Sequence, residues 1–319
     1  MANYLVTGGA GFIGSNLVEY LLDAGEAVRV LDDFETGRRE NLAPFARRIE
    51  LIEGSLTDAD ACRRAVADID YVLHQGAIPS VPRSVDEPVR TSQVNVMGTI
   101  QLLEAARAAG VRRVVYAASS SAYGDQEQPT KDEGLLPAPL SPYAAAKLAG
   151  EYFCQAYSRS MGLETVCLRY FNVFGPRQDP TSTYSAVIPL FVTAVIEGRQ
   201  PIIYGDGTQS RDFTYVENNV RANILAATTP KPVAGRVINV ACGASYSLLE
   251  LFDVIRRYFD SEIEPEFAPP RPGDVKHSLA DITLARELLG FEVTVDFHEG
   301  LRRTMEWYLA HREAWAAGG

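Results

Sequence analysis

Residues 7–14, Thr7-Gly8-Gly9-Ala10-Gly11-Phe12-Ile13-Gly14, separate a short apolar run (Tyr4-Leu5-Val6) from an amphipathic segment that begins at Ser15. This order predicts a strand, a tight turn and a helix. Gly9-x-Gly11-x-x-Gly14 overlaps Gly8-x-x-Gly11-x-x-Gly14, so glycine stands wherever a Cβ would keep the backbone from a pyrophosphate or the helix from its strand. We therefore expect a dinucleotide whose phosphates lie at the helix N-terminus.

A second apolar run, residues 27–31, ends in Asp32 and Asp33. These acids stand at about the distance from the glycines at which a carboxylate meets the adenosine ribose. Because an acid there repels a 2′-phosphate, the pattern favours NAD over NADP. Arg38 and Arg39 could receive such a phosphate, although a solvated loop is the simpler interpretation of this pair.

The chain has 319 residues, of which 46% are hydrophobic, enough for a large core with room for two lobes. Its apolar runs are much shorter than the ~20 residues of a membrane span, and its N-terminus leads directly into the first predicted strand. We therefore expect a soluble, cytoplasmic protein. The formal net charge of −11 argues against nucleic acid as a partner.

The cysteines and histidines do not form a ligand pattern. Cys62, Cys154, Cys167 and Cys242 are widely spaced in apolar or helical surroundings, so we expect buried thiols. The four histidines (His74, His277, His298, His311) form no spaced cluster, and we expect no metal site.

Apolar runs alternate with helical patterns up to about residue 170, at residues 49–52, 71–74, 114–118 and 165–170. This alternation predicts an α/β fold with a doubly wound parallel (Rossmann) sheet, whose ligands collect at the carboxyl ends of the strands. We expect an NAD-binding domain over residues 1–175, with a contribution from residues 213–240, and a smaller, interleaved substrate lobe over residues 176–319. Predicted helices there lie near 186–197, 217–228, 247–258, 283–289 and 297–310, with strands near 202–204 and 236–240.

Ser141-Pro142 predicts the start of a helix that runs to about Met161 and carries Tyr143 and Lys147 on one face, four residues apart. A phenol titrates near ~10, so a tyrosine acts as a base at neutral pH only if a nearby cation favours its phenolate. Lys147 and the positive nicotinamide ring would supply that field. A pair of this kind on a solvated helix face can be coincidental, but the glycine turn and the serines at 119–121 favour catalysis.

With these residues the chain resembles the extended short-chain dehydrogenase/reductases and, within them, the nucleotide-sugar 4-epimerases. The resemblance covers essentially the whole length. It rests on the glycine turn, Ser119 four residues before Tyr123-Gly124, the Tyr143/Lys147 pair, residues 169–177 (RYFNVFGPR), Gly205-Asp206-Gly207 followed by Arg211-Asp212-Phe213, and residues 271–274 (RPGD).

The resemblance implies three catalytic residues. Tyr143 would take the proton from the sugar 4-hydroxyl while the C4 hydride passes to NAD, and the 4-keto sugar would turn before the hydride returns to its other face. Lys147 would lower the pKa of the phenol and bind the nicotinamide ribose. Ser119 would hydrogen-bond to the reacting oxygen.

The resemblance also implies two sets of contacts. The expected cofactor contacts are Gly8, Gly11, Phe12, Ile13, Gly14, Asp32, Gly37, Ser55, Leu56, Gln75, Ala77, Asn95, Tyr143, Lys147 and Tyr170. The expected contacts to a UDP-sugar are Ser80, Ser119, Ser121, Asn172, Ala186, Val187, Tyr204, Arg211, Arg271, Asp274 and Ser278. Arg211 and Arg271 would clamp the diphosphate, Asp274 would hold the uridine ribose, and Ile203-Tyr204 would flank the uracil.

Two positions depart from the family pattern. Ser55 replaces the aspartate that usually meets the adenine amino group, so that contact should be weaker or indirect. Ser278 replaces the bulky tyrosine of relatives restricted to glucose and galactose. Because a small residue leaves room beside the sugar C2, we expect N-acetylated UDP-sugars to be accepted as well as UDP-glucose and UDP-galactose.

Several alternatives remain. A 4,6-dehydratase needs an Asp-Glu pair where this chain has Ser120 and Ser121, whose neutral hydroxyls cannot replace it. A UDP-glucuronate epimerase or decarboxylase could bind its C6 carboxylate near Thr183, Tyr184 and Ser185. A non-enzymatic, NAD-sensing protein on this fold would typically lack the tyrosine or the lysine.

The resemblance further implies a homodimer, paired through helices near residues 92–109 and 143–160. A candidate seam on these helices is Leu102, Leu103 and Ala106 with Leu148 and Tyr152. Core packing would explain the same apolar residues equally well.

Overall fold

The computed structural model describes residues 1–181, 186–270 and 275–313. Its centre is a seven-stranded sheet in the order β12-β7-β5-β4-β1-β2-β3, in which all neighbours run parallel. The strands are β1 (Asn3–Thr7), β2 (Ala27–Asp32), β3 (Ile49–Glu53), β4 (Tyr71–His74), β5 (Arg113–Ser119), β7 (Thr165–Tyr170) and β12 (Arg236–Val240). The predicted doubly wound sheet is therefore confirmed.

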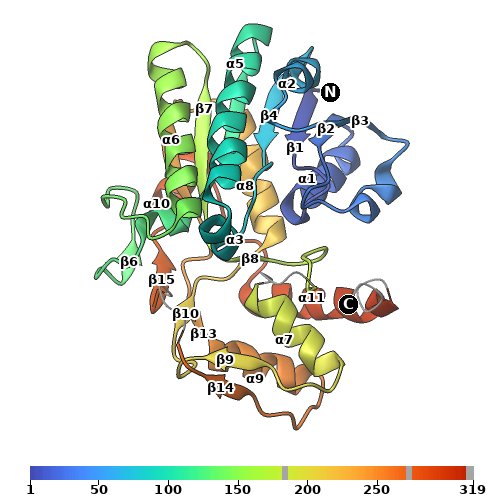
Figure 1. The fold of residues 1–319 in the computed structure, drawn as a ribbon, viewed down its shortest axis with the longest axis vertical. Coiled ribbons are helices and arrows are strands. Elements are labelled where there is room, and N and C mark those ends of the chain that lie inside the picture. The colour runs from blue at the N-terminus through green and yellow to red at the C-terminus, as the bar shows by residue number, and fades with distance from the viewer. Residues whose placement is uncertain (182–185, 271–274, 314–319) are drawn as a thin grey trace.

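Helices cover both faces of this sheet (Figure 1). On one face, α2 (Ala59–Val66), α5 (Thr99–Ala109) and α6 (Pro142–Ser160) pack side by side, and on the other α1 (Phe12–Asp23) packs against α8 (Val216–Thr228). Successive side chains of a strand point to opposite faces. Accordingly Leu5 belongs to the hydrophobic core beneath α2 and α5, while Val6 belongs to the core beneath α1 and α8.

Short elements connect the strands of this large part. They are η1 (Arg39–Asn41), η2 (Ala43–Phe45), α3 (Val81–Asp86), α4 (Pro88–Ser92), the π-helix η3 (Gln93–Gly98) and η4 (Ser120–Tyr123). The π-helix leads directly into α5, so the segment from residue 88 to 109 is one helical run.

The second half of the chain supplies the lower part of Figure 1. This lower part contains α7 (Val187–Ile196), α9 (Leu248–Tyr258) and α11 (Phe297–Ala310), and β9 (Ile202–Tyr204) paired with β14 (Glu266–Ala268). From the same half of the chain, α10 (Thr283–Leu289) packs against β12 and α8 in the upper part. A four-stranded sheet has the order β13 (Tyr246–Ser247), β10 (Ser210–Arg211), β15 (His277–Ala280) and β6 (Thr130–Lys131). A further pair joins β8 (Val173–Phe174) to β11 (Thr214–Tyr215).

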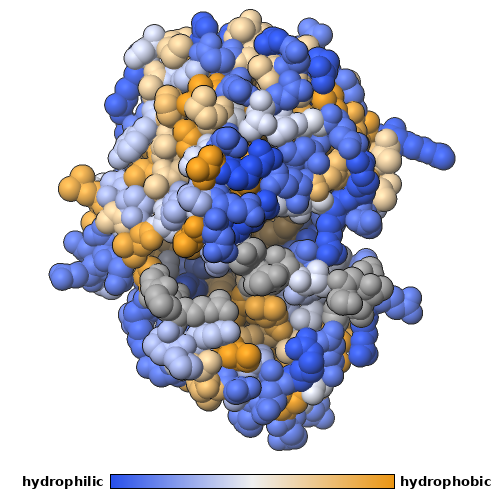
Figure 2. All heavy atoms as spheres, in the orientation of Figure 1, coloured by the Kyte–Doolittle hydropathy of each residue, from blue (hydrophilic) through white to orange (hydrophobic). Residues whose placement is uncertain are grey.

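Figure 2 shows a hollow between the upper and lower parts of the molecule. Phe174 packs edge-on against Phe213, Tyr215 and Phe297, so residues from β8, β11 and α11 share one aromatic cluster. Within the described ranges, every helix is too short or too polar to cross a membrane.

One expectation about burial needs correction, and core packing, the alternative left open for the candidate seam, accounts for four of its residues. Cys62, Cys154 and Cys167 are buried free thiols as predicted, but Cys242 is half-buried at the end of β12. In the candidate seam, Leu102, Leu103, Ala106 and Leu148 belong to the core of the single chain, and Tyr152 is exposed.

Candidate active site

The glycine turn joins β1 to α1 so tightly that Gly8 and Gly14 have no room for a side chain. A Cβ on Gly14 would stand 2.0 Å from the Gly8 carbonyl oxygen, and Gly8 itself has a left-handed φ of +66°. Helix α1 begins after Gly11 without a side-chain cap and without an acidic residue in its first turn. Its first N–H groups and its positive dipole end therefore suit a diphosphate.

Asp32 closes the next strand at the edge of the same cavity. Its carboxylate accepts hydrogen bonds from the N–H groups of Ala10 and Phe34, both at 2.8 Å. Burial raises the pKa of this carboxyl group, and the two backbone bonds oppose that rise. Two oxygens fixed in this way can still accept the hydroxyls of a ribose.

Arg38 and Arg39, the alternative phosphate receivers, have other partners. Arg38 forms an ion pair with Asp179 at 3.1 Å, and Arg39 pairs with Glu53 at 2.6 Å while lying over the Phe34 ring. Their charges are therefore balanced by protein carboxylates, in keeping with NAD rather than NADP.

A cavity of about 720 Å³ runs along the carboxyl ends of the strands. It brings together most of the predicted cofactor residues with two of the predicted substrate residues, Ser80 and Ala186. The cofactor residues in its lining are Gly8, Gly11, Phe12, Ile13, Gly14, Asp32, Gly37, Leu56, Gln75, Ala77, Tyr143, Lys147 and Tyr170.

Two predicted cofactor residues have structural partners instead of facing this cavity. The Ser55 hydroxyl accepts hydrogen bonds from the backbone and the side chain of Thr57. The Asn95 side-chain amide binds both the N–H and the carbonyl of Ile78, at 2.8 and 3.0 Å. Asn95 therefore shapes the loop after β4, which itself lines the cavity.

His74 has a structural role that no sequence pattern predicted. Its ring lies between the hydroxyls of Thr7 and Thr99, at 2.7 and 3.0 Å, and Thr7 in turn accepts the Gly76 N–H. Complete burial, assisted by the positive charge of Lys147, lowers the pKa of His74 to about 3. A neutral imidazole thus ties β1 and β4 together where both meet the cavity.

Tyr143, Lys147 and Ser119 converge from α6 and β5. The Ser119 side chain lies near the Tyr143 hydroxyl and lowers the pKa of the phenol, against the larger opposing effect of desolvation. Ser119 also accepts a hydrogen bond from the Ser121 hydroxyl at 2.8 Å. Lys147 is buried and donates from Nζ to the Ala117 carbonyl at 2.9 Å.

Tyr170 belongs to a second polar group on the cavity wall. Its hydroxyl exchanges hydrogen bonds with the side chains of Gln75 and Asn223. Burial raises the pKa of Tyr170 to about 12, so this phenol stays protonated and both donates to and accepts from these amides.

The remaining predicted substrate residues come from the second half of the chain. Arg211 on β10 pairs in register with Ser278 on β15, so a cation and a small, half-buried hydroxyl lie side by side. Tyr204 ends β9, Val187 begins α7, and Asn172 has a left-handed φ of +36° just before β8. Arg271, Asp274 and Thr183–Ser185 lie outside the described residues.

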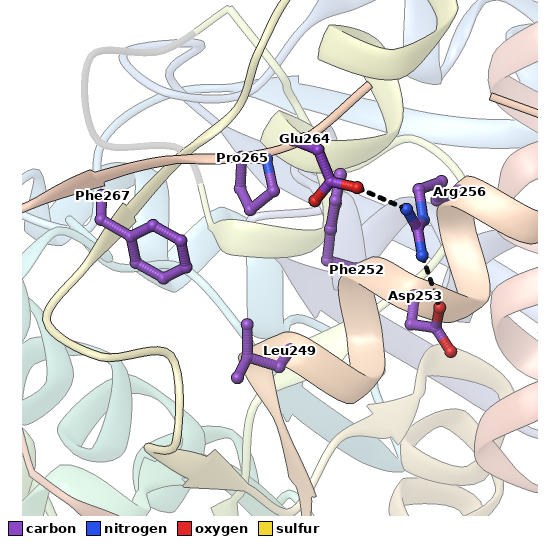
Figure 3. A pocket seen from close by; sticks show the side chains of 7 residues that line it. All are labelled: Leu249, Phe252, Asp253, Arg256, Glu264, Pro265 and Phe267. Carbon is purple, nitrogen blue, oxygen red and sulfur yellow. Dashed lines mark hydrogen bonds and ion pairs between the residues drawn. The ribbon is translucent and has the colours of Figure 1, made fainter. Parts of the chain in front are cut away.

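A second cavity, of about 340 Å³, lies between α9 and β14 (Figure 3). Arg256 there forms ion pairs with Asp253 at 3.3 Å and Glu264 at 2.7 Å. Since its charged groups satisfy one another and none of the predicted site residues line it, the chemistry belongs to the larger cavity. Across residues 1–181, 186–270 and 275–313, no three potential metal ligands gather at one point.

Comparisons with known proteins agree with this geometry. The model of the NAD-dependent epimerase/dehydratase family matches residues 4–241. A UDP-glucose 4-epimerase of Mycolicibacterium smegmatis is 41% identical over 308 residues, which are 95% of this chain and 97% of that protein.

Two solved structures have closely similar folds. The UDP-N-acetylglucosamine 4-epimerase of Methanobrevibacter ruminantium, in complex with UDP-N-acetylmuramic acid, has a TM-score of 0.92 at 42% identity, covering 97% of this chain and 99% of its own. The UDP-glucose 4-epimerase of Thermus thermophilus, in complex with NAD, has a TM-score of 0.87 at 37% identity, covering 96% and 99%.

The glycine turn, Asp32 and the Tyr143/Lys147 pair line one cavity, the arrangement expected of a nicotinamide-dependent enzyme. The chain belongs to the NAD-dependent epimerase/dehydratase family, and its cofactor is NAD.

Proposed function

We propose that the protein is a UDP-sugar 4-epimerase. The observation that carries this proposal is the convergence of Tyr143 and Lys147 on the wall of the cavity that the glycine turn and Asp32 also line, with Ser119 beside Tyr143. NAD fits this cavity because Gly8, Gly11 and Gly14 leave the α1 N-terminus bare. Its relatives among the 4-epimerases support the reaction type.

The protein's own part in this reaction is to move one proton and to hold the reacting oxygen. Tyr143 as phenolate removes the proton of the sugar 4-hydroxyl and returns it to the new alcohol, so no net proton is consumed. Ser119 holds the same oxygen by a hydrogen bond, and the Lys147 charge favours the phenolate. Bound NAD supplies the other half of the chemistry by accepting the C4 hydride and giving it back.

We further propose that Arg211 binds the diphosphate and that Tyr204 flanks the uracil, with Arg271 and Asp274 completing the UDP site. The support is the position of β9 and β10 in the lower part of the molecule, with Ser278 beside Arg211. Residues 1–175 with 213–240 would then form the NAD-binding lobe, and the remainder the UDP-sugar lobe.

The small Ser278 leaves space beside the predicted diphosphate clamp, and we propose that an N-acetyl group at the sugar C2 occupies it. UDP-N-acetylglucosamine and UDP-N-acetylgalactosamine would then be substrates along with UDP-glucose and UDP-galactose. A dehydratase is disfavoured because Ser120 and Ser121 stand in η4, where that reaction requires an acid and a base.

The test is a 4-epimerase assay of the purified protein on UDP-glucose, UDP-galactose, UDP-N-acetylglucosamine and UDP-glucuronate, without added cofactor and then with NAD. We expect interconversion of both the plain and the N-acetylated pairs. Turnover confined to UDP-glucuronate would replace this proposal with a uronate epimerase or decarboxylase. Tightly bound NAD without turnover of any sugar would indicate a sensing protein.

We also propose a homodimer, formed through α4, η3 and α6. These elements pack together and expose the apolar side chains Val89, Met97, Tyr152 and Phe153, of which Val89 is 70% and Tyr152 54% exposed. A patch of this kind on adjacent helices suits a second copy. Light scattering of the purified protein should give twice the 34.9 kDa chain mass, and Tyr152→Arg should reduce it to one chain.

We place the protein in the cytoplasm. Four free thiols, three of them buried, suit a reducing compartment. Cell fractionation with an antibody against the chain tests this assignment.

A further inference from the structure

Helix α6 carries a third ionisable side chain, Glu151, on the face that holds the proposed catalytic pair. Tyr143, Lys147 and Glu151 follow one another at four-residue intervals and so share one helix face. Lys147 and Glu151 are both buried, Glu151 completely. The face that carries the catalytic residues therefore continues inward to a buried carboxylate.

Arg169 on β7 holds this carboxylate with two hydrogen bonds. Its Nε and Nη2 donate to the two oxygens of Glu151 at 2.9 and 2.7 Å. The side chains of Arg169 and Glu151 are only 4% and 1% exposed, and the guanidinium lies 4.5 Å from the centre of the Tyr123 ring. Tyr123 is fixed in turn by a 2.7 Å hydrogen bond to Asn239.

A buried ion pair is an inefficient way to stabilise a fold. Removing two charges from water costs several kcal/mol for each ion, and apolar residues of similar volume often replace such pairs without loss. The packing of α6 against β7 therefore does not by itself explain why the Glu151–Arg169 pair is present. The effect of the pair on the charges beside it offers another explanation.

The groups that face Lys147 come from three elements. They are Tyr143, Glu151 and Cys154 on α6, His74 on β4, and Tyr116 on β5, whose ring centre is 5.1 Å from Nζ. Burial keeps His74 neutral, and burial likewise raises the pKa of Tyr116, so that this phenol stays neutral. Within this group Glu151 is the carboxylate; its charge and Cys154 both favour protonated Lys147, while the Arg169 cation on β7 shares the charge of Glu151.

We propose that Glu151, held in place by Arg169, is a positioning residue that keeps Lys147 protonated inside the cavity wall and thereby sustains the field that favours the Tyr143 phenolate. This inference rests on the proposed function for its catalytic meaning. Burial lowers the pKa of Lys147, Cys154 and the charge of Glu151 oppose that fall, and the resulting pKa is about 8, close to working pH. Without Glu151 the pKa of Lys147 would be lower, so Lys147 would lose its proton at a lower pH.

The first test measures this protonation directly in the NAD-loaded protein. The chain has four lysines, so ¹³C-lysine labelling gives a readable NMR titration, with Lys147→Arg identifying its signal. We expect Glu151→Gln to move the Lys147 midpoint down by about one pH unit. Glu164→Gln, the same charge change in the Arg113 ion pair at the other end of β7, should leave it in place.

Glu151→Gln leaves Arg169 buried without its partner and can unfold the protein. The double variant Glu151→Gln/Arg169→Met removes both charges and tests the same point in a folded chain. We expect its Lys147 midpoint also to fall. A folded double variant whose Lys147 titrates like the wild type would overturn the proposal.

The second test is the pH profile of kcat/KM for a UDP-sugar. In both variants the alkaline limb of the profile should move to lower pH, while KM for the UDP-sugar stays near the wild-type value. An unchanged alkaline limb with a uniform loss of activity would overturn the positioning role. If the wild type turns over no UDP-sugar, the proposed function fails, and the NMR titration still decides whether Glu151 holds the Lys147 proton.

Discussion

At the scale of single residues, we propose that Tyr143 carries the chemistry, because it lines the cavity and Ser119 lies beside its hydroxyl. Tyr143→Phe keeps the ring and removes the proton carrier. We expect kcat to fall by at least about 10²-fold while NAD stays bound. The matched control is Tyr152→Phe, which alters an exposed tyrosine on the same helix. Near-normal turnover by Tyr143→Phe would contradict the assignment.

His74 gives a pH dependence of stability. Its folded pKa of about 3 lies below the ordinary value of 6.5, so its contribution is complete above pH 6.5 and is lost as pH falls toward 3. Between about pH 7 and about pH 5 we expect His74 to account for a loss of about 2 kcal/mol in the free energy of unfolding.

Urea unfolding at both pH values measures this loss. The pH-dependent difference should shrink by that amount in His74→Gln and persist in His298→Gln, which changes an exposed histidine. Equal pH dependence in wild type and His74→Gln would show that His74 is not held neutral.

We propose that Ser278 decides which sugars fit. Ser278→Tyr places a large ring beside Arg211 on the neighbouring strand. We expect kcat/KM for the N-acetylated substrates to fall at least about tenfold more than for UDP-glucose. Steady-state kinetics on both substrates measures the ratio, and an equal loss on both would place the C2 pocket elsewhere.

At the scale of elements, the β1–turn–α1 unit requires glycine at position 14. Gly14→Ala would push a methyl group into the Gly8 carbonyl, so α1 must move away from the turn. We expect loss of bound NAD, measured by absorbance of the purified protein, together with a lower Tm. Gly25→Asn, just beyond the same helix in open space with φ +78°, should change neither. NAD content unchanged in Gly14→Ala would remove the turn from the cofactor site.

The long elements could be predicted because their own residues show a period. Helices 283–289 and 297–310 and strands 202–204 and 236–240 have the predicted bounds. Strands β10 and β13 have two residues each, too few to show a period in the sequence. β10 pairs with both β13 and β15, so tertiary contacts set these strands. Asn95 was expected to meet the cofactor, but the π-helix turns its amide to the Ile78 backbone.

At the scale of the whole molecule, the sequence places the glycine turn, Asp32 and the Tyr143/Lys147 pair at strand ends, and the sheet order brings them to one cavity. The His74 network and the Glu151–Arg169 pair could not be predicted in this way. Both join residues that are distant in sequence through burial, and no local pattern marks them.

In the proposed reaction, the C4 hydrogen leaves the sugar and returns to it within one closed site. The most direct measurement is ¹H NMR of a UDP-sugar incubated with the purified protein in D₂O. We predict that the 4-epimer appears and retains its C4 proton, because the hydride passes to NAD and back without meeting solvent. Absence of the epimer, or deuterium at C4 of the epimer, would contradict this account.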